Sequence, residues 1–321
     1  MADSTDPDHD GDTDPDHDGD TDPDDSTDGE TVPDDDADGP DDADAEIPAR
    51  LRENLYVVVE ELVDHEGLLV ALDFDGTLAA IENLPEEATI PDPTREAVAS
   101  LADEPNVEVA VVSGRELADV RERVGVPDIS YAGNHGLEIH ADEYTVHPTA
   151  SAAKDDIAEL CDLLTDELAD IEGVIVENKG VTATVHHRLV DDDEVPRVVD
   201  SVESLVAARD DVRLTTGKDV LELRPAVEWD KGEAVRELRD ELVPDDERWL
   251  PVYVGDDTTD EAAFSLLDDR GLGVKVGDDP ATEAPYRVAD PEAVRAVLEW
   301  LHEYGVEFVA ADHRDGSAET S

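Results

Sequence analysis

The stretch GLLVALDFDGTLAAIE, from Gly67 to Glu82, indicates both the fold and the chemistry of this chain. A run of aliphatic and small residues leads directly into Asp73 and Asp75, which are one residue apart and are followed by Gly76. Two carboxylates at the end of a buried strand repel each other and lose hydration unless a cation or a reacting group compensates them. The stretch therefore predicts a buried strand that ends at a charged site.

Apolar runs and amphipathic segments alternate on both sides of the middle of the chain. The apolar runs lie at 68–74, 107–112, 129–133, 251–255 and 272–276. Helical patterns occupy 91–105, 115–125, 230–242, 258–271 and 290–305. Short strands that alternate with amphipathic helices predict an α/β fold with a parallel sheet covered on both faces.

The middle of the chain, from about residue 137 to 223, breaks this rhythm. Strand patterns there come in pairs, 174–180 with 181–187 and 212–217 with 220–225, and helices are expected at 151–169 and 193–208. Paired strands joined by tight turns with glycine predict hairpins and an antiparallel α+β sheet. We therefore expect a parallel-sheet core, similar to a Rossmann fold, that is interrupted by one inserted cap, or lid, domain.

The charge of the chain is extreme. Its 321 residues include 89 acidic and 23 basic ones, for a net charge of −66, and only five of the basic residues are lysine. High salt shortens the Debye length to about 3 Å at 1 M and so removes the self-repulsion. Because the acid is spread over every expected helix, we infer a protein of an extreme-halophile cytoplasm rather than a polyanion that binds basic partners. Nucleic-acid binding is not expected, because little positive charge is available to neutralise phosphates.

The ends of the chain differ from its body. Residues 1–50 hold 22 acidic residues and one basic residue, with almost no large apolar side chains. Such a composition predicts disorder. The single cysteine, Cys161, excludes an internal disulfide framework, and neither a signal peptide nor a membrane span is expected. The expected division is a disordered acidic tail, a two-part core, a cap and a disordered C-terminus: residues 1–47, 48–138 with 226–312, 139–225 and 313–321.

Four polar clusters directly follow expected strands or begin a helix. In open α/β sheets, ligands bind outside the carboxyl ends of the strands. The clusters offer carboxylates for a hard cation, a hydroxyl and backbone amides for phosphate oxygens, and an ammonium, which together fit phosphoryl transfer. They are Asp73-Phe-Asp75-Gly-Thr77, Ser113-Gly-Arg115, Lys231, and Gly255-Asp256-Asp257-x-x-Asp260.

The motifs D-x-D-G-T-L, S-G-R, a lone lysine and G-D-D-x-x-D, in this order, resemble the haloacid dehalogenase (HAD) superfamily of phosphatases. Over residues 66–300, the stretches YAGNHGLEI, ENKGVTATVHHR, LELRP, DKG, GDDTTDEAAF and GVKVG are similar to trehalose-6-phosphate phosphatases. The resemblance implies a HAD-like core with a cap, and a Mg²⁺-dependent hydrolysis of trehalose 6-phosphate to trehalose and phosphate.

The resemblance also implies a role for each core residue. Asp73 would be the nucleophile that forms an aspartyl phosphate, and Asp75 would act as acid and then as base. Mg²⁺ would bind the Asp73 carboxylate, the Asp75 backbone carbonyl and Asp256. The resemblance further implies that Ser113 and Lys231 hold phosphate oxygens and that Asp260 and Asp257 contact the ligands of the metal rather than the metal itself. The remaining residues expected to bind the substrate are Gly76, Thr77, Gly114 and Arg115.

The cap would bind the sugar. Carboxylates suit paired sugar hydroxyls, because each oxygen accepts a hydrogen bond from a donor. By resemblance, the residues expected to face the sugar are Asn134, His135, Glu177, Lys179, His186, Arg188, Glu222 and Arg224. The implied partners are a small sugar phosphate and, in the same pathway, a trehalose-6-phosphate synthase.

Three other readings stay open at this point. The same fold would serve a phosphatase for another sugar phosphate, such as sucrose 6-phosphate or mannosyl-3-phosphoglycerate, and a panel of sugar phosphates discriminates between the substrates. It would also serve a phosphotransferase or mutase, which keeps the phospho-aspartate from water and releases no phosphate. A reading from a different class is a non-catalytic acidic protein that binds Ca²⁺ or basic partners through its tail; survival of activity after deletion of residues 1–47 would speak against it.

Overall fold

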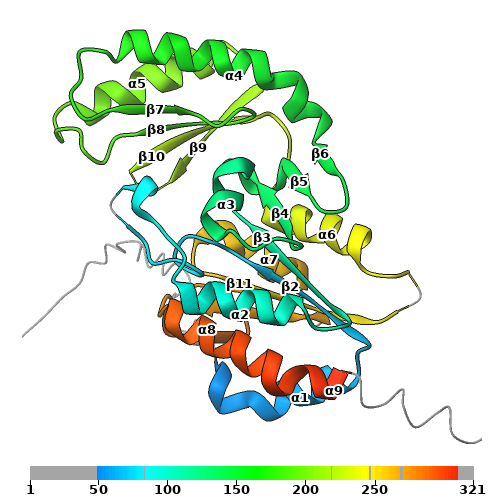
Figure 1. Cartoon of the computed structure of the whole chain (residues 1–321). Helices are drawn as coiled ribbons and strands as arrows, with labels where there is room; N and C mark the ends of the chain where they lie inside the picture. The colour runs from blue at the N-terminus through cyan, green and yellow to red at the C-terminus, as the bar shows by residue number, and fades with distance from the viewer. Residues whose placement is uncertain (1–48, 83, 218, 246, 268–269, 310–321) are drawn as a thin grey trace, which may run out of the picture. The chain divides into compact units, whose positions relative to one another are not determined.

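The computed structural model describes residues 49–309 except 83, 218, 246 and 268–269. Its larger sheet has the order β1-β13-β12-β11-β2-β3-β4-β5-β6 (Figure 1). All neighbouring pairs from β1 to β4 are parallel. The strands are β1 Ala49–Arg50, β2 Gly67–Leu72, β3 Val107–Val112, β4 Ser130–Gly133, β5 Glu138–His140, β6 Tyr144–Val146, β11 Trp249–Gly255, β12 Leu272–Val276 and β13 Tyr286–Val288. The prediction of an α/β fold with a parallel-sheet core is confirmed.

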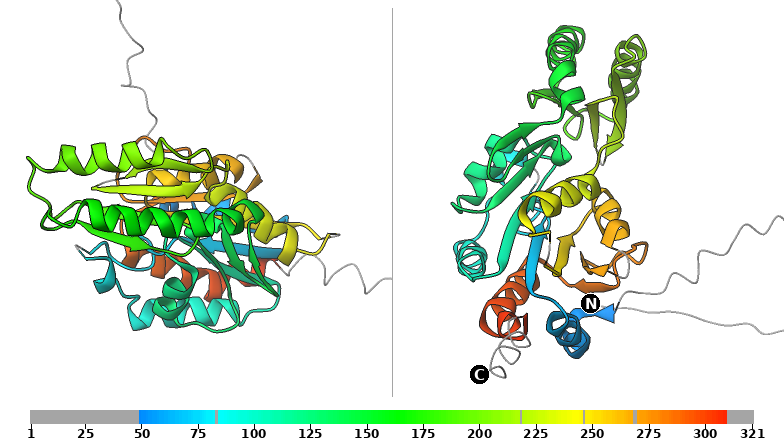
Figure 2. Two further views of the ribbon diagram at one scale, coloured as in Figure 1. Left: turned by 90° about the horizontal axis from the view of Figure 1, so that it is seen from above. Right: turned by 90° about the vertical axis from the view of Figure 1, so that its right-hand side faces the viewer.

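Helices cover both faces of this sheet. The strands β2, β3 and β11 are buried on both faces, so their apolar residues run almost without interruption. One face packs against α1, α2, α3 and α8, and the other packs against α6 and α7 (Figure 2). The helix bounds are α1 Leu55–Val63, α2 Asp92–Ala102, α3 Leu117–Val124, α6 Lys231–Leu242, α7 Glu261–Leu267, α8 Pro291–Trp300 and α9 Val306–Val309.

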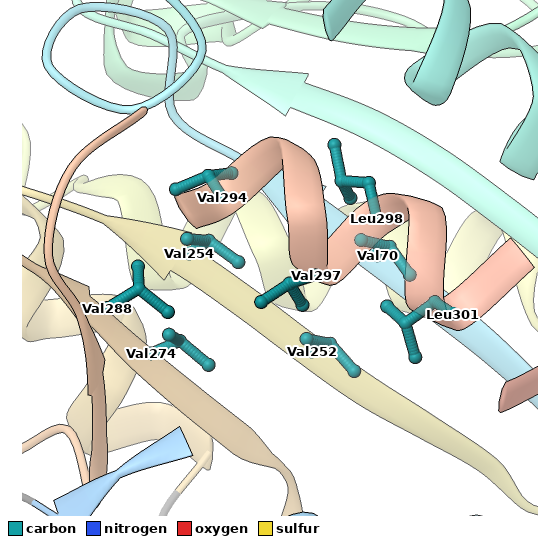
Figure 3. Close-up of a pocket in the computed structure, with 9 residues that line it drawn as sticks. All are labelled: Val70, Val252, Val254, Val274, Val288, Val294, Val297, Leu298 and Leu301. Atoms are coloured by element: carbon teal, nitrogen blue, oxygen red, sulfur yellow. The ribbon is translucent and has the colours of Figure 1, made fainter. Parts of the chain in front are cut away.

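The packing of α8 shows how the first face is filled. Valine and leucine side chains of α8 meet valines from β2, β11, β12 and β13 (Figure 3). Val252 and Val254 occupy alternate positions of β11, as the twofold repeat of a strand requires. All the residues drawn in this contact are apolar, so the contact stabilises the sheet and offers no group for chemistry. The polar site must lie at the strand ends.

The edge of the larger sheet differs from the sequence expectation. Residues 138–146 were expected in the inserted segment, but β5 and β6 continue the core sheet and pair antiparallel with β4 and with each other. The chain reverses after β4 through three residues with positive φ, Asn134 (50°), His135 (58°) and Gly136 (91°). Left-handed conformation is uncommon for residues other than glycine, so the pattern of apolar residues did not indicate this reversal.

A second sheet of four strands, with the order β7-β8-β10-β9, has an apolar core of its own. It is antiparallel throughout, which confirms the two hairpins expected in the middle of the chain. Its elements are α4 Pro148–Glu167, β7 Ile175–Asn178, β8 Ala183–His186, α5 Val195–Val206, β9 Val212–Gly217 and β10 Val220–Pro225. Buried residues of α4 and α5 pack on one face of this sheet.

The opposite face of the second sheet is polar. Glu177, Thr184, Glu222 and Thr215 form one row across the four strands, because they are register partners. Their sequence neighbours Val176, Val185 and Leu221 point to the apolar core. Successive side chains of a strand alternate between faces, so the sequence itself separates this polar row from the core.

Several other expectations concern single features. Cys161 is buried and takes part in no disulfide. Among the described residues, no helix combines the length and the apolar character that crossing a membrane requires. The expected disordered tails, residues 1–47 and 313–321, lie outside the described residues.

Candidate active site

The carboxyl ends of β2, β3 and β11 lie side by side because these strands are parallel neighbours. Asp73 follows β2, Ser113 follows β3 and Asp256 follows β11. The backbone N–H of Asp73 donates to the carbonyl of Val254 at 2.9 Å, which extends the β2–β11 pairing to the start of the motif. Lys231 begins α6, whose N-cap is Asp230. The sheet therefore brings together the four clusters that the sequence analysis selected.

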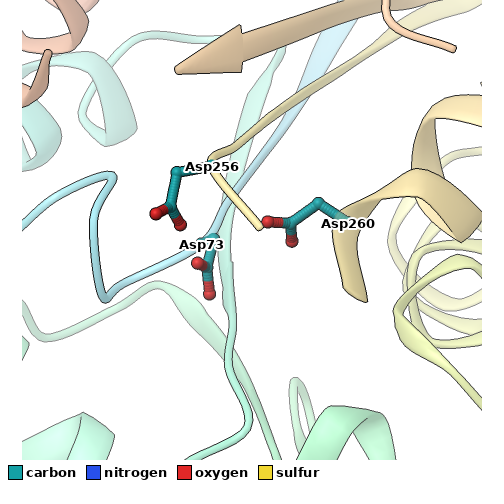
Figure 4. Close-up of side chains that lie close together, drawn as sticks. All are labelled: Asp73, Asp256 and Asp260. Carbon is teal, nitrogen blue, oxygen red and sulfur yellow. The ribbon is translucent and has the colours of Figure 1, made fainter. Parts of the chain in front are cut away.

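Three aspartates form an acidic cluster at this edge (Figure 4). Oxygen atoms of Asp73, Asp256 and Asp260 lie within 4.8 Å of one another. Asp260 is fully buried and both of its oxygens are engaged: Oδ1 accepts from Lys231 Nζ at 2.7 Å, and Oδ2 accepts from the backbone N–H of Asp257 at 2.9 Å. Asp73 and Asp256 are therefore the members of the cluster best placed to bind a cation.

Lys231 is the positive centre of the cluster. Its side chain is 3% exposed, and its Nζ lies 2.9 Å from Asp73 Oδ1 and 2.7 Å from Asp260 Oδ1. Burial would lower its pKa, but the charges of Asp260 and Asp73 outweigh burial and raise the pKa of this lysine. Lys231 therefore stays protonated as a buried point charge beside Asp73.

The pKa values of two carboxylates are raised as well, but here burial and repulsion between the aspartates are the cause. Burial, with repulsion from Asp260 and Asp256, raises the pKa of Asp73 well above its usual value in spite of Lys231. Burial and repulsion from Asp260 also raise the pKa of Asp256 to about 6. One lysine thus does not neutralise the cluster, and a further cation among these oxygens would favour their ionised forms.

Two neighbours of the motif show how closely the site is packed. Gly76 has φ 76°, and a Cβ at this position would lie 2.0 Å from the Asp256 carboxylate, so only glycine fits there. The Oγ1 atom of Thr77 is buried, and no described group hydrogen-bonds to it. A buried polar atom without a partner in a native protein usually marks a place for water, an ion or a ligand.

Asp75 lies beside the cluster rather than within it. Its two oxygens accept from Arg115 Nε and Nη2, both at 2.7 Å, which is a bidentate pair. Arg115 also donates to Asp119 at 2.9 Å and lies over the ring of Phe74. Arg115 was expected to contact the substrate; in this structure the contacts described for it hold Asp75 in one orientation.

The Ser113 loop is buried against the segment that follows β4. Ser113 is 1% exposed, and its Oγ accepts from the backbone N–H of Arg115 at 3.2 Å, so its own hydrogen is available to another acceptor. A Cβ at Gly114 would lie 2.7 Å from the His135 ring, which explains why glycine occupies this position. The side chain of Asp257 caps the turn Thr258–Asp260 and accepts from the backbone N–H of Thr258.

Residues of the second sheet reach this edge from the β7–β8 hairpin. Lys179 Nζ donates to the carbonyl of Gly114 at 3.3 Å. Glu177 accepts from His186 at 2.9 Å, and its pKa is lowered mainly by this bond. Arg188 contacts Asp219 at 3.3 Å.

Glu222 and Arg224 lie on the polar face of β10. Glu222 lies 3.4 Å from His135 Nε2, which is a contact between the two sheets. Burial alone would raise the pKa of Glu222, but the hydrogen bond and charge of His135, with the charges of Lys179 and Arg224, lower it to about 2. Arg224 is buried and donates to the carbonyl of Trp229 at 2.9 Å.

Two buried polar residues near the site, Tyr253 and Lys275, were not expected from the sequence. Tyr253 donates to Asp260 Oδ1 at 2.6 Å. Lys275 is 3% exposed, and its Nζ lies 3.3 Å from the carbonyl of Asp257 and 3.4 Å from Glu261 Oε1. Both were detectable, because a tyrosine inside a buried strand needs a partner for its hydroxyl, and a rare lysine at a strand end needs a carboxylate or carbonyl.

Comparison with known proteins agrees with this geometry. Residues 71–292 match the family model described as trehalose-phosphatase. The chain belongs to the trehalose-phosphatase family. A trehalose-phosphate phosphatase of Mycobacterium marinum is 44% identical over 200 residues, which are 61% of this chain and 50% of that protein. The chain spans half or less of the length of such curated relatives.

Solved structures share the fold of this trehalose-phosphatase family member. A trehalose-6-phosphate phosphatase related protein superposes with a TM-score of 0.65 at 27% identity, over 74% of this chain and 99% of the other. A haloacid dehalogenase-like hydrolase from Bacteroides thetaiotaomicron shares the fold, with a TM-score of 0.52 at 15% identity over 73% of this chain and 99% of the other. The resemblance found in the sequence motifs is confirmed.

Proposed function

We propose that this protein is a Mg²⁺-dependent phosphatase that hydrolyses trehalose 6-phosphate to trehalose and phosphate. The observation that carries the proposal is the contact of Lys231 with Asp73 inside the acidic cluster, beside the unpartnered hydroxyl of Thr77. Family membership supports the substrate, because the M. marinum relative bears the name trehalose-phosphate phosphatase.

The donor set of the cluster fits a hard divalent cation. Mg²⁺ prefers one or two carboxylates together with oxygens of the substrate and water. Asp73 and Asp256 supply the carboxylates, the Asp75 backbone carbonyl is the expected third protein ligand, and Asp260 with Asp257 supports the Asp256 loop. When bound, the ion would neutralise the charge that otherwise opposes an anionic nucleophile and an anionic phosphate.

In the proposed reaction, the chain's own residues form and break the bonds. Asp73 attacks phosphorus, the bond from phosphorus to the sugar oxygen breaks, and Asp75 gives its proton to the departing oxygen. Asp75 then takes a proton from the water that hydrolyses the aspartyl phosphate. Lys231 and Ser113 hold phosphate oxygens, and Arg115 orients Asp75 through its bidentate contact.

We propose that the part of the inserted segment that carries the second sheet, from α4 to β10, acts as the cap, with the core formed by the segments on either side of it. The expected boundary at residue 139 moves accordingly, because β5 and β6 belong to the core sheet. The polar face of the second sheet supports this role, because Glu177 and Glu222 lie on it and Lys179 already reaches the Ser113 loop. Carboxylates and an ammonium on this face are suited to the hydroxyls of a disaccharide. The net charge of −66 supports the proposal that the protein functions in a high-salt cytoplasm. A trehalose-6-phosphate synthase in the same pathway would supply the substrate.

The substrate proposal is tested with a panel of sugar phosphates. The purified chain, kept in strong salt with Mg²⁺, should release inorganic phosphate from trehalose 6-phosphate with the highest kcat/KM in a panel that includes sucrose 6-phosphate and mannosyl-3-phosphoglycerate. A higher kcat/KM for another member would refute the substrate but keep the phosphatase. No phosphate release from any member would favour the non-catalytic reading.

Removing the metal is expected to abolish activity. After complete chelation, phosphate release should fall below about one thousandth of the starting rate, because the unneutralised cluster repels the phosphate. Adding Mg²⁺ back should restore the rate, whereas Na⁺ or K⁺ at the same ionic strength should not. An unchanged rate after chelation would refute the metal proposal.

A further inference from the structure

Asn134 joins three segments of the chain through its backbone and side chain. It has φ 50°, which is uncommon for a residue other than glycine, and it is fully buried. Its backbone N–H donates to the carbonyl of Arg115 at 2.7 Å, and that of His135 donates to the carbonyl of Ser113 at 2.8 Å. The reversal after β4 is therefore attached to the loop that follows β3.

Each polar atom of the Asn134 side chain has a partner within the protein. Nδ2 donates to Glu138 Oε2 at 2.6 Å and to the carbonyl of Lys179 at 3.1 Å, and Oδ1 accepts from Thr182 Oγ1 at 2.6 Å. Glu138 also accepts from the hydroxyl of Tyr144 at 2.8 Å. A carboxylate and a carbonyl can only accept, so the orientation of the amide is determined by its partners.

Two of these partners lie on the turn between β7 and β8. Within this turn, Lys179 N donates to the carbonyl of Thr182 at 2.9 Å, and Gly180 N donates to Asn178 Oδ1 at 2.9 Å. The same turn carries the Lys179 side chain to the carbonyl of Gly114, and Glu177 lies just before it. The position of the turn thus decides where Glu177 and Lys179 point.

We propose that Asn134 is a positioning residue that fixes the β7–β8 turn against the core, so that Glu177 and Lys179 face the sugar part of the substrate. The role of these two residues in binding rests on the proposed function, but the fixing of the turn does not. Direct contact of Asn134 with the sugar is disfavoured, because its side chain is fully buried and both of its polar atoms are engaged. Thr182 donates to the amide oxygen of Asn134, and Glu138 accepts from its amide nitrogen.

Thr182 offers the sharper test, because it is buried and has no expected role in binding or chemistry. Thr182→Val keeps the shape and removes the hydroxyl that donates to Asn134. The KM for trehalose 6-phosphate should rise roughly tenfold, the equivalent of about 1.4 kcal/mol for one lost hydrogen bond. Thr182→Ser should restore KM to within about twofold, since it keeps the hydroxyl. The kcat/KM for p-nitrophenyl phosphate, an ester without sugar, should not change in either variant.

A donor–acceptor exchange tests Asn134 itself. Asn134→Asp keeps the size and the tolerance for positive φ, but it places a carboxylate against Glu138, so KM for the sugar phosphate should rise more than KM for p-nitrophenyl phosphate. In the double variant Asn134→Asp with Glu138→Gln, the glutamine amide can donate to the new carboxylate and should recover part of the loss. Asn106→Asp is the matched control, because Asn106 also has positive φ (64°) but is exposed and directly precedes β3.

Amide hydrogen exchange separates this inference from the proposed function. Without substrate, exchange at residues 177–182 should be faster in Thr182→Val than in the wild type, and Thr182→Ser should match the wild type. If this holds while the wild type does not hydrolyse trehalose 6-phosphate, the proposed function fails and the fixing of the turn stands. Unchanged exchange and unchanged KM in Thr182→Val and in Asn134→Asp, with both variants folded, would overturn the inference.

Discussion

Asp73→Asn is expected to lower kcat for sugar-phosphate hydrolysis by about ten-thousandfold or more, because an amide cannot form the aspartyl phosphate. The fold should survive the change. Burial and the neighbouring carboxylates raise the pKa of Asp73, so its ionised form costs folding free energy at neutral pH. Asparagine removes this charge and still offers an oxygen to Lys231 Nζ, so the thermal midpoint without added metal should not fall.

The measurement is phosphate release under saturating substrate, together with thermal unfolding in the same buffer. Asp142→Asn is the matched control, since Asp142 is an exposed aspartate between β5 and β6. It should leave kcat and the midpoint unchanged. Turnover by Asp73→Asn within a hundredfold of the wild type, in a preparation free of deamidated protein, would remove Asp73 from the role of nucleophile.

The sequence was sufficient to predict the central parallel strands of the larger sheet and the cluster at their carboxyl ends. Asp73, Ser113 and Asp256 each follow an apolar run, and the carboxyl ends of parallel strands meet at one edge whatever the loops do. Lys231 was found because lysine is rare in this chain and because Asp230 marks the start of a helix. These positions follow from apolar runs and helix capping, which are local properties of the sequence.

Contacts between the two sheets could not be predicted in the same way. The pairing of Asn134 with Thr182, and of His135 with Glu222, depends on a reversal through positive φ that apolar periodicity does not reveal. The bidentate contact of Arg115 with Asp75 depends on the rotamers of two charged residues, and charged residues are expected to be exposed when only the sequence is known. Such contacts join residues that are 40 or more positions apart, and a single sequence gives no signal that ties them together.

Replacement of Lys231 by methionine is expected to have the largest combined effect on activity and stability. Methionine fills a similar volume but leaves Asp73 and Asp260 as buried carboxylates without their cation. Removing one partner of a buried charge pair costs about 3–5 kcal/mol of folding free energy. The kcat should fall by about a thousandfold, since the point charge that holds the phosphate and the ionised form of Asp73 are lost together.

The stability deficit of Lys231→Met should depend on pH in a defined direction. Without the lysine, the pKa of Asp73 in the folded state lies still further above its usual value near 4. A carboxyl with a raised pKa in the folded state destabilises the fold at pH values above its unfolded pKa and has no such effect below it. The deficit, measured by denaturant unfolding without metal, should therefore be largest at neutral pH and should shrink as the pH falls toward about 4.

A second substitution separates charge from chemistry. In the double variant Lys231→Met with Asp260→Asn, one of the two carboxylates that lost their cation is replaced by a neutral amide. Part of the lost stability should therefore return, while kcat stays low. Lys154→Met removes an exposed lysine of α4 and is the control for loss of a positive charge. If Lys231→Met alone kept wild-type stability at neutral pH, the buried triad of Lys231 with Asp73 and Asp260 would not be the centre that holds this site together.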